Sequence, residues 1–210
     1  MTRPPAAPGH ARVTRADWIA AAMERLVADG PEAVKIKPLA ERLGVSRSSF
    51  YWYFRDRQDL LDGLLAHWQQ VNTAALVRQA ERPAPTITAA VCNVFRCAVN
   101  PALFDPGLDL TVRDWARRSA PVRAAVDRSD AARMAALAAM FARHGYAEEE
   151  AETRARILYY MQIGYSATEP SEPIEARLRL LRPYLVAFTG REPREAEVAE
   201  FRRYARTVAR

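Results

Sequence analysis

Hydrophobic residues recur every three or four positions along most of the chain, which is the spacing that places them on one face of an α-helix. The first such run begins after Thr14, a good N-cap whose capping box Asp17 completes, and it ends at Gly30 and Pro31. No long stretch alternates with the period of two that strands need, while glycine is scarce and alanine abundant. The pattern therefore predicts an all-α protein.

The same spacing predicts a series of further helices, separated by breaks that contain proline or glycine. They cover residues 37–43, 47–54, 56–81, 86–100, 108–118, 121–144, 148–165, 174–188 and 193–210. Residues 1–13 are rich in proline, alanine and arginine, and we expect them to form a disordered tail. A small three-helix domain is expected over residues 14–55 and a larger helical domain over 56–210, which begins with a connecting helix at 56–81.

Residues 37–61, KPLAERLGVSRSSFYWYFRDRQDLL, predict a helix, a tight turn, a second helix and the start of a third. Gly44 lies where the first helix must stop, and Ser46 is the N-cap of the next. Phe50 and Phe54 are four residues apart and are predicted to pack in the core. The opposite face carries short polar and large aromatic side chains, which are costly to expose unless a partner covers them. The segment is typical of a helix-turn-helix that presents its second helix to a DNA major groove.

The chemistry of these side chains suits DNA. Arg47 can donate to both acceptors of a guanine edge, while Ser48 and Ser49 are short enough for close approach of the backbone. Lys37 and Arg57 begin the flanking helices and are expected to clamp phosphates. The candidate DNA contacts are Lys37, Ser46, Arg47, Ser48, Ser49, Tyr51, Trp52, Tyr53 and Arg57. A helical protein-interaction module without sequence-specific DNA binding is the alternative, because helix-turn-helix patterns also occur in proteins that never touch DNA.

Composition narrows the function classes. The net charge of +6 permits a polyanionic partner without demanding one. Cys92 and Cys97 stand alone and the three histidines are scattered, so we expect buried, reduced thiols and no metal site. No catalytic Ser-His-acid order or glycine-rich phosphate loop appears, and we expect neither an enzyme nor a cofactor. With no apolar run of membrane-spanning length and no signal peptide, a cytoplasmic protein without a membrane partner is expected.

Residues 39–61, LAERLGVSRSSFYWYFRDRQDLL, resemble the tetracycline-repressor-type (TetR) family of bacterial transcription factors, and the likeness extends over about residues 15–62. The resemblance implies a homodimer on a palindromic operator, and a C-terminal pocket whose small-molecule ligand releases the repressor from DNA. Many members have lysine where Arg57 or Gln58 stands, and we assign that phosphate clamp to Arg57. Trp52 occupies a position that is often smaller or basic, so no operator preference carries over. Residues 112–165 also look like a C-terminal type common in this family, which identifies no ligand.

The C-terminal domain offers candidates for both implied roles. Family members join through their last two long helices, here about 149–165 and 174–188, which suggests Leu158, Leu178, Leu181 and Leu185 for the dimer interface. Candidates for ligand contact are Phe95, Phe104, Trp115, Met134, Phe141, Tyr159, Met161 and Tyr165. Packing in the protomer core remains open for every residue of both sets. Arg96 and Arg113 could meet an anion if buried, or they could be solvated or pair with a carboxylate such as Asp109 or Asp114.

Overall fold

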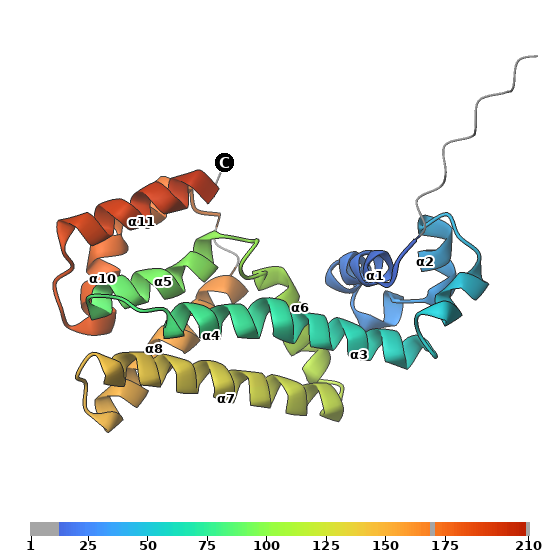
Figure 1. The fold of residues 1–210 in the computed structure, drawn as a ribbon, viewed down its shortest axis with the longest axis horizontal. Coiled ribbons are helices and arrows are strands. Elements are labelled where there is room, and N and C mark those ends of the chain that lie inside the picture. The colour runs from blue at the N-terminus through green and yellow to red at the C-terminus, as the bar shows by residue number, and fades with distance from the viewer. Residues whose placement is uncertain (1–12, 169–170, 209–210) are drawn as a thin grey trace, which may run out of the picture. The chain divides into compact units, whose positions relative to one another are not determined.

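The computed structural model describes residues 13–168 and 171–208, in which all the regular elements are helices, as predicted (Figure 1). The chain divides into two compact units between Leu64 and Leu65, within a helix, whereas the sequence pattern placed the boundary after residue 55. The expected tail falls outside the described residues except for Val13. No helix of the described ranges is long and apolar enough to cross a bilayer.

Unit 1 contains α1 (Arg15–Asp29), a 3₁₀ turn, α2 (Ile36–Arg42), a 3₁₀ helix (Arg47–Trp52) and the first part of α3 (Arg57–Trp68). The predicted capping box is present, because the N–H of Asp17 donates to Oγ1 of Thr14 over 3.3 Å and the N–H of Thr14 donates to Oδ2 of Asp17 over 2.7 Å. Gly44 adopts a φ of +67° just after α2, which explains why the turn needs glycine there.

The second helix of the helix-turn-helix is tighter and shorter than predicted. The N–H of Ser49 donates to the carbonyl of Ser46 over 3.0 Å, and that of Tyr53 donates to the carbonyl of Phe50 over 3.0 Å. Bonds between residues three apart define a 3₁₀ helix, so the expected α-helix over 47–54 is corrected to a 3₁₀ helix that ends at Trp52.

An aromatic core fixes this helix against α1. Phe50 is fully buried, meets Trp18 edge-on at 5.3 Å between ring centroids, and stacks on Phe54 at 5.2 Å. Leu39 of α2 and Leu60 of α3 are buried as well. The prediction that Phe50 and Phe54 are core residues is therefore confirmed, and the outward face of the 3₁₀ helix is held on a rigid apolar base.

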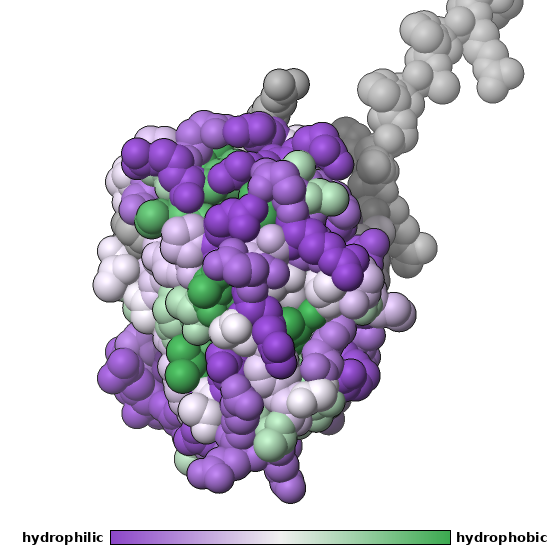
Figure 2. Space-filling view, turned by 90° about the vertical axis from the view of Figure 1, so that its left-hand side faces the viewer, coloured by the Kyte–Doolittle hydropathy of each residue, from purple (hydrophilic) through white to green (hydrophobic). Residues whose placement is uncertain are grey.

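Unit 2 begins within α3 and continues through a π-helical turn (Gln69–Thr73) into α4 (Ala74–Glu81), so the helix expected at 56–81 is present but locally widened. The later elements are α5 (Ile87–Val99), α6 (Pro106–Ala116), α7 (Ala120–Arg143), α8 (Glu148–Ala167), α9 (Ile174–Arg179), α10 (Leu181–Thr189) and α11 (Glu195–Val208). The helix predicted over 174–188 is thus interrupted at Leu180. On the face drawn in Figure 2, hydrophobic side chains form separate patches among hydrophilic ones.

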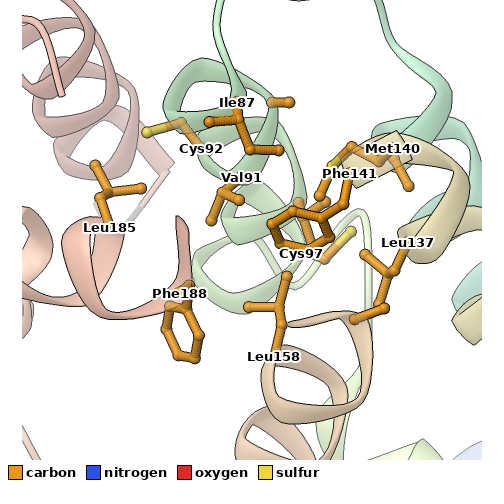
Figure 3. Packing of buried hydrophobic residues seen from close by; sticks show 14 of the residues in the cluster. Ile87, Val91, Cys92, Cys97, Leu137, Met140, Phe141, Leu158, Leu185 and Phe188 are labelled. Atoms are coloured by element: carbon orange, nitrogen blue, oxygen red, sulfur yellow. The ribbon is translucent and has the colours of Figure 1, made fainter. Parts of the chain in front are cut away.

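The core of unit 2 surrounds α5. Figure 3 shows Val91 and Cys97 of this helix beside side chains of α7, α8 and α10. Cys92 and Cys97 are unpaired and buried, as predicted, and burial raises the pKa of both thiols to about 12.

Candidate functional site

The exposed side of the 3₁₀ helix carries polar and aromatic side chains. The side chain of Trp52 is 70% exposed and that of Tyr51 is 50% exposed, although Phe50 beside them is fully buried. Arg47 lies one helical turn before Tyr51, and its Nη2 donates to the Tyr51 hydroxyl over 3.5 Å. We call the exposed set Ser46, Arg47, Ser48, Tyr51 and Trp52 the recognition surface.

Three serines at the start of the helix bond to one another. The hydroxyl oxygens of Ser46 and Ser48 are 2.8 Å apart, and Ser49 donates its hydroxyl to the Ser46 carbonyl over 2.8 Å. Ser46 occupies the predicted N-cap position, but its side chain makes no capping hydrogen bond to a backbone N–H. The side-chain cap expected there is therefore wrong, because the Ser46 hydroxyl faces Ser48 instead.

Tyr53 and Arg57 are engaged within unit 1. The Tyr53 hydroxyl donates to the Val13 carbonyl over 2.7 Å. Nε of Arg57 donates to the Val34 carbonyl over 2.7 Å, and its Nη2 donates to the Pro31 carbonyl. The Arg57 guanidinium thus fastens the loop between α1 and α2 to the start of α3, and its role as a phosphate clamp stays a prediction.

Two further cations of unit 1, Lys37 and Arg55, each pair with a carboxylate four residues along the chain. The Lys37 side chain is 79% exposed and that of Arg55 is 84% exposed, and their nearest carboxylates lie 3.9 and 3.6 Å away, respectively. Sequence reasoning named Lys37 but missed Arg55. The sequence could have indicated Arg55, because a residue that directly follows the buried Phe54 at the end of the motif is expected to face solvent.

Unit 2 contains three adjoining hollows that share lining residues, and Gln162 of α8 borders all of them. The outer hollow, of about 70 Å³, is lined by Phe95, Met161, Tyr165, Leu180 and Tyr184 among others. The middle hollow, of about 30 Å³, is mostly apolar and includes Phe95, Phe104, Leu137, Leu158 and Tyr159. The inner hollow, also about 30 Å³, is bordered by Phe104, Asp109, Arg133, Tyr159 and Ser166.

Five predicted ligand candidates line these hollows, namely Phe95, Phe104, Tyr159, Met161 and Tyr165. Three do not. Met134 borders a separate groove along α7 and α8. Phe141 is fully buried and packs edge-on against Tyr146 at 5.4 Å, and Trp115 is buried in α6 away from the three hollows.

A network of polar side chains, which we call the buried polar cluster, lies beside the inner hollow. Oδ1 of Asp109 accepts from Nε1 of Trp68 over 2.9 Å and lies 2.9 Å from Nη1 of Arg133. Oδ2 of Asp109 accepts from Nε of Arg113 over 2.9 Å. Both Nη atoms of Arg113 donate to Asp130, over 2.9 and 2.7 Å. The cluster comprises Trp68, Asp109, Arg113, Asp130, Arg133 and Tyr159.

The cluster shifts the pKa values of Asp109 and Tyr159. Burial disfavours the charged form of Asp109, but the guanidiniums of Arg133 and Arg113 outweigh it and the pKa of the carboxyl lies below its ordinary value. Burial raises the pKa of the Tyr159 phenol, which donates to Asp130 over 2.6 Å. Of the arrangements considered for Arg113, the pairing with a carboxylate is confirmed. Arg96 also pairs with a carboxylate, that of Glu200 at 3.2 Å.

The predicted interface leucines lie inside the protomer. Leu158, Leu178, Leu181 and Leu185 are at most 3% exposed and belong to the core of unit 2, which corrects their assignment to a dimer surface. Their positions on α8 to α10 face the core because α5 and α11 pack there. The same stretch of chain exposes other large apolar side chains, those of Ile157, Tyr160, Leu180 and Tyr184.

Within the described residues, no group of three histidine, cysteine or acidic side chains is arranged to hold a metal ion. Unit 1 is a helix-turn-helix with an aromatic core, and unit 2 is an all-helical unit with internal hollows. This combination is typical of helix-turn-helix regulators. Residues 19–64 match the family model described as "Bacterial regulatory proteins, tetR family". This match lies within unit 1, and the coarse function that it supports is that of a DNA-binding transcriptional regulator.

Solved structures agree on the fold. AmtR from Mycobacterium smegmatis aligns over 98% of this chain and 99% of its own, with a TM-score of 0.57 and 21% identity. Salmonella enterica GusR aligns over 93% of this chain and 94% of its own, with a TM-score of 0.58 and 15% identity. A transcriptional regulator from Rhodococcus sp. Rha1 aligns over 93% of this chain and 96% of its own, with a TM-score of 0.58 and 17% identity. A search of curated proteins by sequence gave no match.

Proposed function

We propose that this protein is a ligand-responsive repressor, which binds a palindromic operator as a homodimer in the cytoplasm and leaves it when a small molecule enters unit 2. The observation that carries the DNA-binding part is the recognition surface, where Arg47, Tyr51 and Trp52 project from a helix whose other side is fixed by buried Phe50. A rigid base beneath exposed donors and aromatics is what a surface needs to read a groove without first being ordered.

Each part of this surface has a role in the proposal. Arg47 reads a base edge or holds a phosphate, and the hydroxyls of Ser48 and Tyr51 contact the backbone of the duplex. Lys37 and Arg55 supply electrostatic attraction from either side. Arg57 and Tyr53 act indirectly, by holding the helix-turn-helix in shape.

The homodimer is proposed through the exposed apolar side chains of α8 to α10. Ile157 is 54% exposed, Tyr160 50%, Leu180 45% and Tyr184 39%. Large apolar groups gathered on neighbouring elements are favoured at interfaces, and two copies of the same patch form a closed two-fold contact. Two copies of the recognition surface then match the two halves of a palindrome.

Hydrogen bonds link the hollows to the segment that continues from unit 1. Trp68 lies at the end of α3 and donates to Asp109, while Thr73 of the π-helical turn accepts from Nε of Arg133 over 3.0 Å. Asn72 of the same turn donates to the Asp105 carbonyl over 2.8 Å. A ligand that changes this network shifts the population toward an arrangement that does not fit DNA, and by linkage DNA weakens the ligand equally.

Selection of genomic fragments at two salt concentrations tests the proposal. An inverted repeat that stays enriched at the higher salt supports a sequence-specific dimer. Arg47→Ala and Tyr51→Phe should each weaken binding to that repeat, by about tenfold for Arg47→Ala, without lowering the melting temperature appreciably. Arg117→Ala, which removes a 77% exposed arginine of unit 2, is the matched control and should leave binding unchanged.

Other results would count against the proposal. Recovery of unenriched, salt-sensitive DNA alone would favour the protein-interaction module. A large loss of stability in Arg47→Ala would mean that weaker binding reflects unfolding and not the loss of a DNA contact. Sedimentation of a monomer at micromolar concentration would contradict the homodimer, whereas a dimer that Tyr160→Glu dissociates would support the interface on α8.

A further inference from the structure

Arg133 has an unsatisfied donor next to a cavity. Its side chain is 1% exposed, its Nε donates to Thr73, and its Nη1 serves Asp109 and Tyr159. Nη2 is buried and finds no hydrogen-bond partner among the described residues, although it belongs to a residue that borders the inner hollow. A buried donor without an acceptor costs folding free energy, so its presence calls for an explanation such as a bound ligand.

The position of this guanidinium is fixed from two sides. Its central carbon lies 5.2 Å from the centroid of the Trp68 ring and 5.4 Å from that of Phe104. The two aromatic contacts and the bonds to Thr73 and Asp109 leave the group little freedom to turn Nη2 toward another acceptor. The donor is thus pre-organised, which lowers the entropic cost of binding a ligand there.

The charges around the donor already cancel. Arg113 and Arg133 face Asp109 and Asp130, so the buried polar cluster has two positive and two negative groups. A carboxylate ligand would add a negative charge that nothing in the cluster balances, and a buried uncompensated charge is costly. An uncharged acceptor would satisfy Nη2 without this cost. An ammonium group does not fit, because it has no acceptor for the N–H that Nη2 of Arg133 offers.

The middle hollow is small and mostly apolar, whereas the lining of the outer one also includes Glu172 and Arg177. The middle hollow is lined by side chains such as Leu76, Val94 and Leu137. The three hollows, of about 70, 30 and 30 Å³, are each smaller than the roughly 150 Å³ in which an apolar cavity holds one benzene ring, so a ligand there must be compact. We propose that the effector is an uncharged, compact and mostly apolar molecule with one carbonyl oxygen, which accepts a hydrogen bond from Nη2 of Arg133.

This inference rests on the proposed function, because it takes the hollows as the effector site. Three probes of equal heavy-atom count test it on the full chain by NMR titration, namely pentan-2-one, 2-methylpentane and butanoate. The ketone should bind about tenfold more tightly than the hydrocarbon, since a hydrogen bond to a charged donor contributes on that scale, and more tightly than butanoate. Equal affinity for ketone and hydrocarbon, or tightest binding of butanoate, would overturn the proposal.

A pair of variants assigns the effect to Arg133. Arg133→Lys keeps a cation beside Asp109 but removes Nη2, so the preference for ketone over hydrocarbon should disappear. Arg96→Lys is the matched control, because Arg96 is also largely buried with an unpaired nitrogen but borders none of the three hollows. An unchanged preference in Arg133→Lys would overturn the assignment. If Arg133→Lys does not fold, the affinities of the three probes for the unaltered chain still test the proposed ligand class.

The same samples separate the two proposals. Ketone binding that depends on Arg133 but leaves affinity for the selected DNA unchanged would support the chemistry of the site and contradict its role as an effector site. Sequence-specific DNA binding without any preference for the ketone would support the regulator and overturn the ligand class.

Discussion

The recognition surface of unit 1 and the buried polar cluster of unit 2 are built in opposite ways. The first comes from one contiguous stretch, residues 46–52, and its side chains lie exposed above an apolar base. The second draws Trp68 from α3, two residues each from α6 and α7, and Tyr159 from α8. An exposed group can leave its hydrogen bonds to water or to a partner, whereas a buried one must find them within the protein. Sites of the second kind are therefore assembled from distant residues.

This difference should appear first in stability. Exposed polar groups contribute little to the free energy of unfolding, while removal of one partner from a buried ion pair leaves an uncompensated charge. Substitutions in the cluster should therefore unfold the protein more readily than those in the recognition surface, whatever either does to function.

The largest effect is expected for Asp109→Asn. The variant keeps the shape of the side chain but removes the negative charge that faces Arg133 and Arg113 at 2.9 Å each. Urea denaturation should show a loss of about 3–5 kcal/mol. Asp114→Asn on the same helix, whose side chain is 61% exposed, is the control and should change stability by no more than about 0.5 kcal/mol. Similar losses in both variants would erase the distinction between buried and exposed charges.

The same pair predicts a dependence on pH. Burial opposes ionisation of Asp109, but Arg133 and Arg113 bring its folded-state pKa below the ordinary value of 3.8. Its stabilising contribution is therefore complete above that value and is lost as the pH falls through the folded-state pKa. The stability difference between the unaltered protein and Asp109→Asn should stay constant from neutral pH down to about pH 5 and narrow below about pH 4. A difference that widens in acid would reverse the assigned sign.

An intermediate effect is expected for Arg57→Met, which tests a residue at the border of the recognition surface. The loss of its bonds to the Val34 and Pro31 carbonyls should cost about 1–3 kcal/mol in urea denaturation. Arg55→Met, at an 84% exposed side chain, should cost less than about 0.5 kcal/mol but reduce the salt dependence of DNA binding by about one ion. The opposite result, with Arg57→Met stable and less salt-dependent, would support the phosphate clamp predicted from the sequence.

Local rules predicted unit 1 well. The capping box of Thr14 and Asp17, the stop at Gly44 and the buried pair Phe50 and Phe54 all depend on residues within a few positions of one another. The partners of Arg57 were not predictable in this way, because Val34 and Pro31 lie more than twenty positions earlier and offer only backbone oxygens. No pattern of side chains announces such a contact.

Unit 2 shows the limit of hydrophobic spacing. The spacing located most helices of the unit, but it could not divide Leu158 and Leu185, which are core residues, from Ile157 and Leu180, which are exposed. All four are apolar, and only the packing of α5 and α11 decides which side is covered. Arg133 was missed for a related reason, since an arginine among alanines in a long helix is typical of a solvated face.

The smallest effects separate two helix starts that look alike in the sequence. Thr14 accepts from the N–H of Asp17 and forms a complete capping box, so Thr14→Ala should lose about 1 kcal/mol. Ser46 holds the corresponding position before the 3₁₀ helix, but its hydroxyl meets that of Ser48 at 2.8 Å and caps no backbone N–H. Ser46→Ala should therefore cost only a few tenths of a kcal/mol, roughly the range of ordinary surface changes, while it weakens DNA binding. Equal losses in urea denaturation would show that Ser46 caps its helix after all, and that the recognition surface carries more of the stability of unit 1 than its exposure indicates.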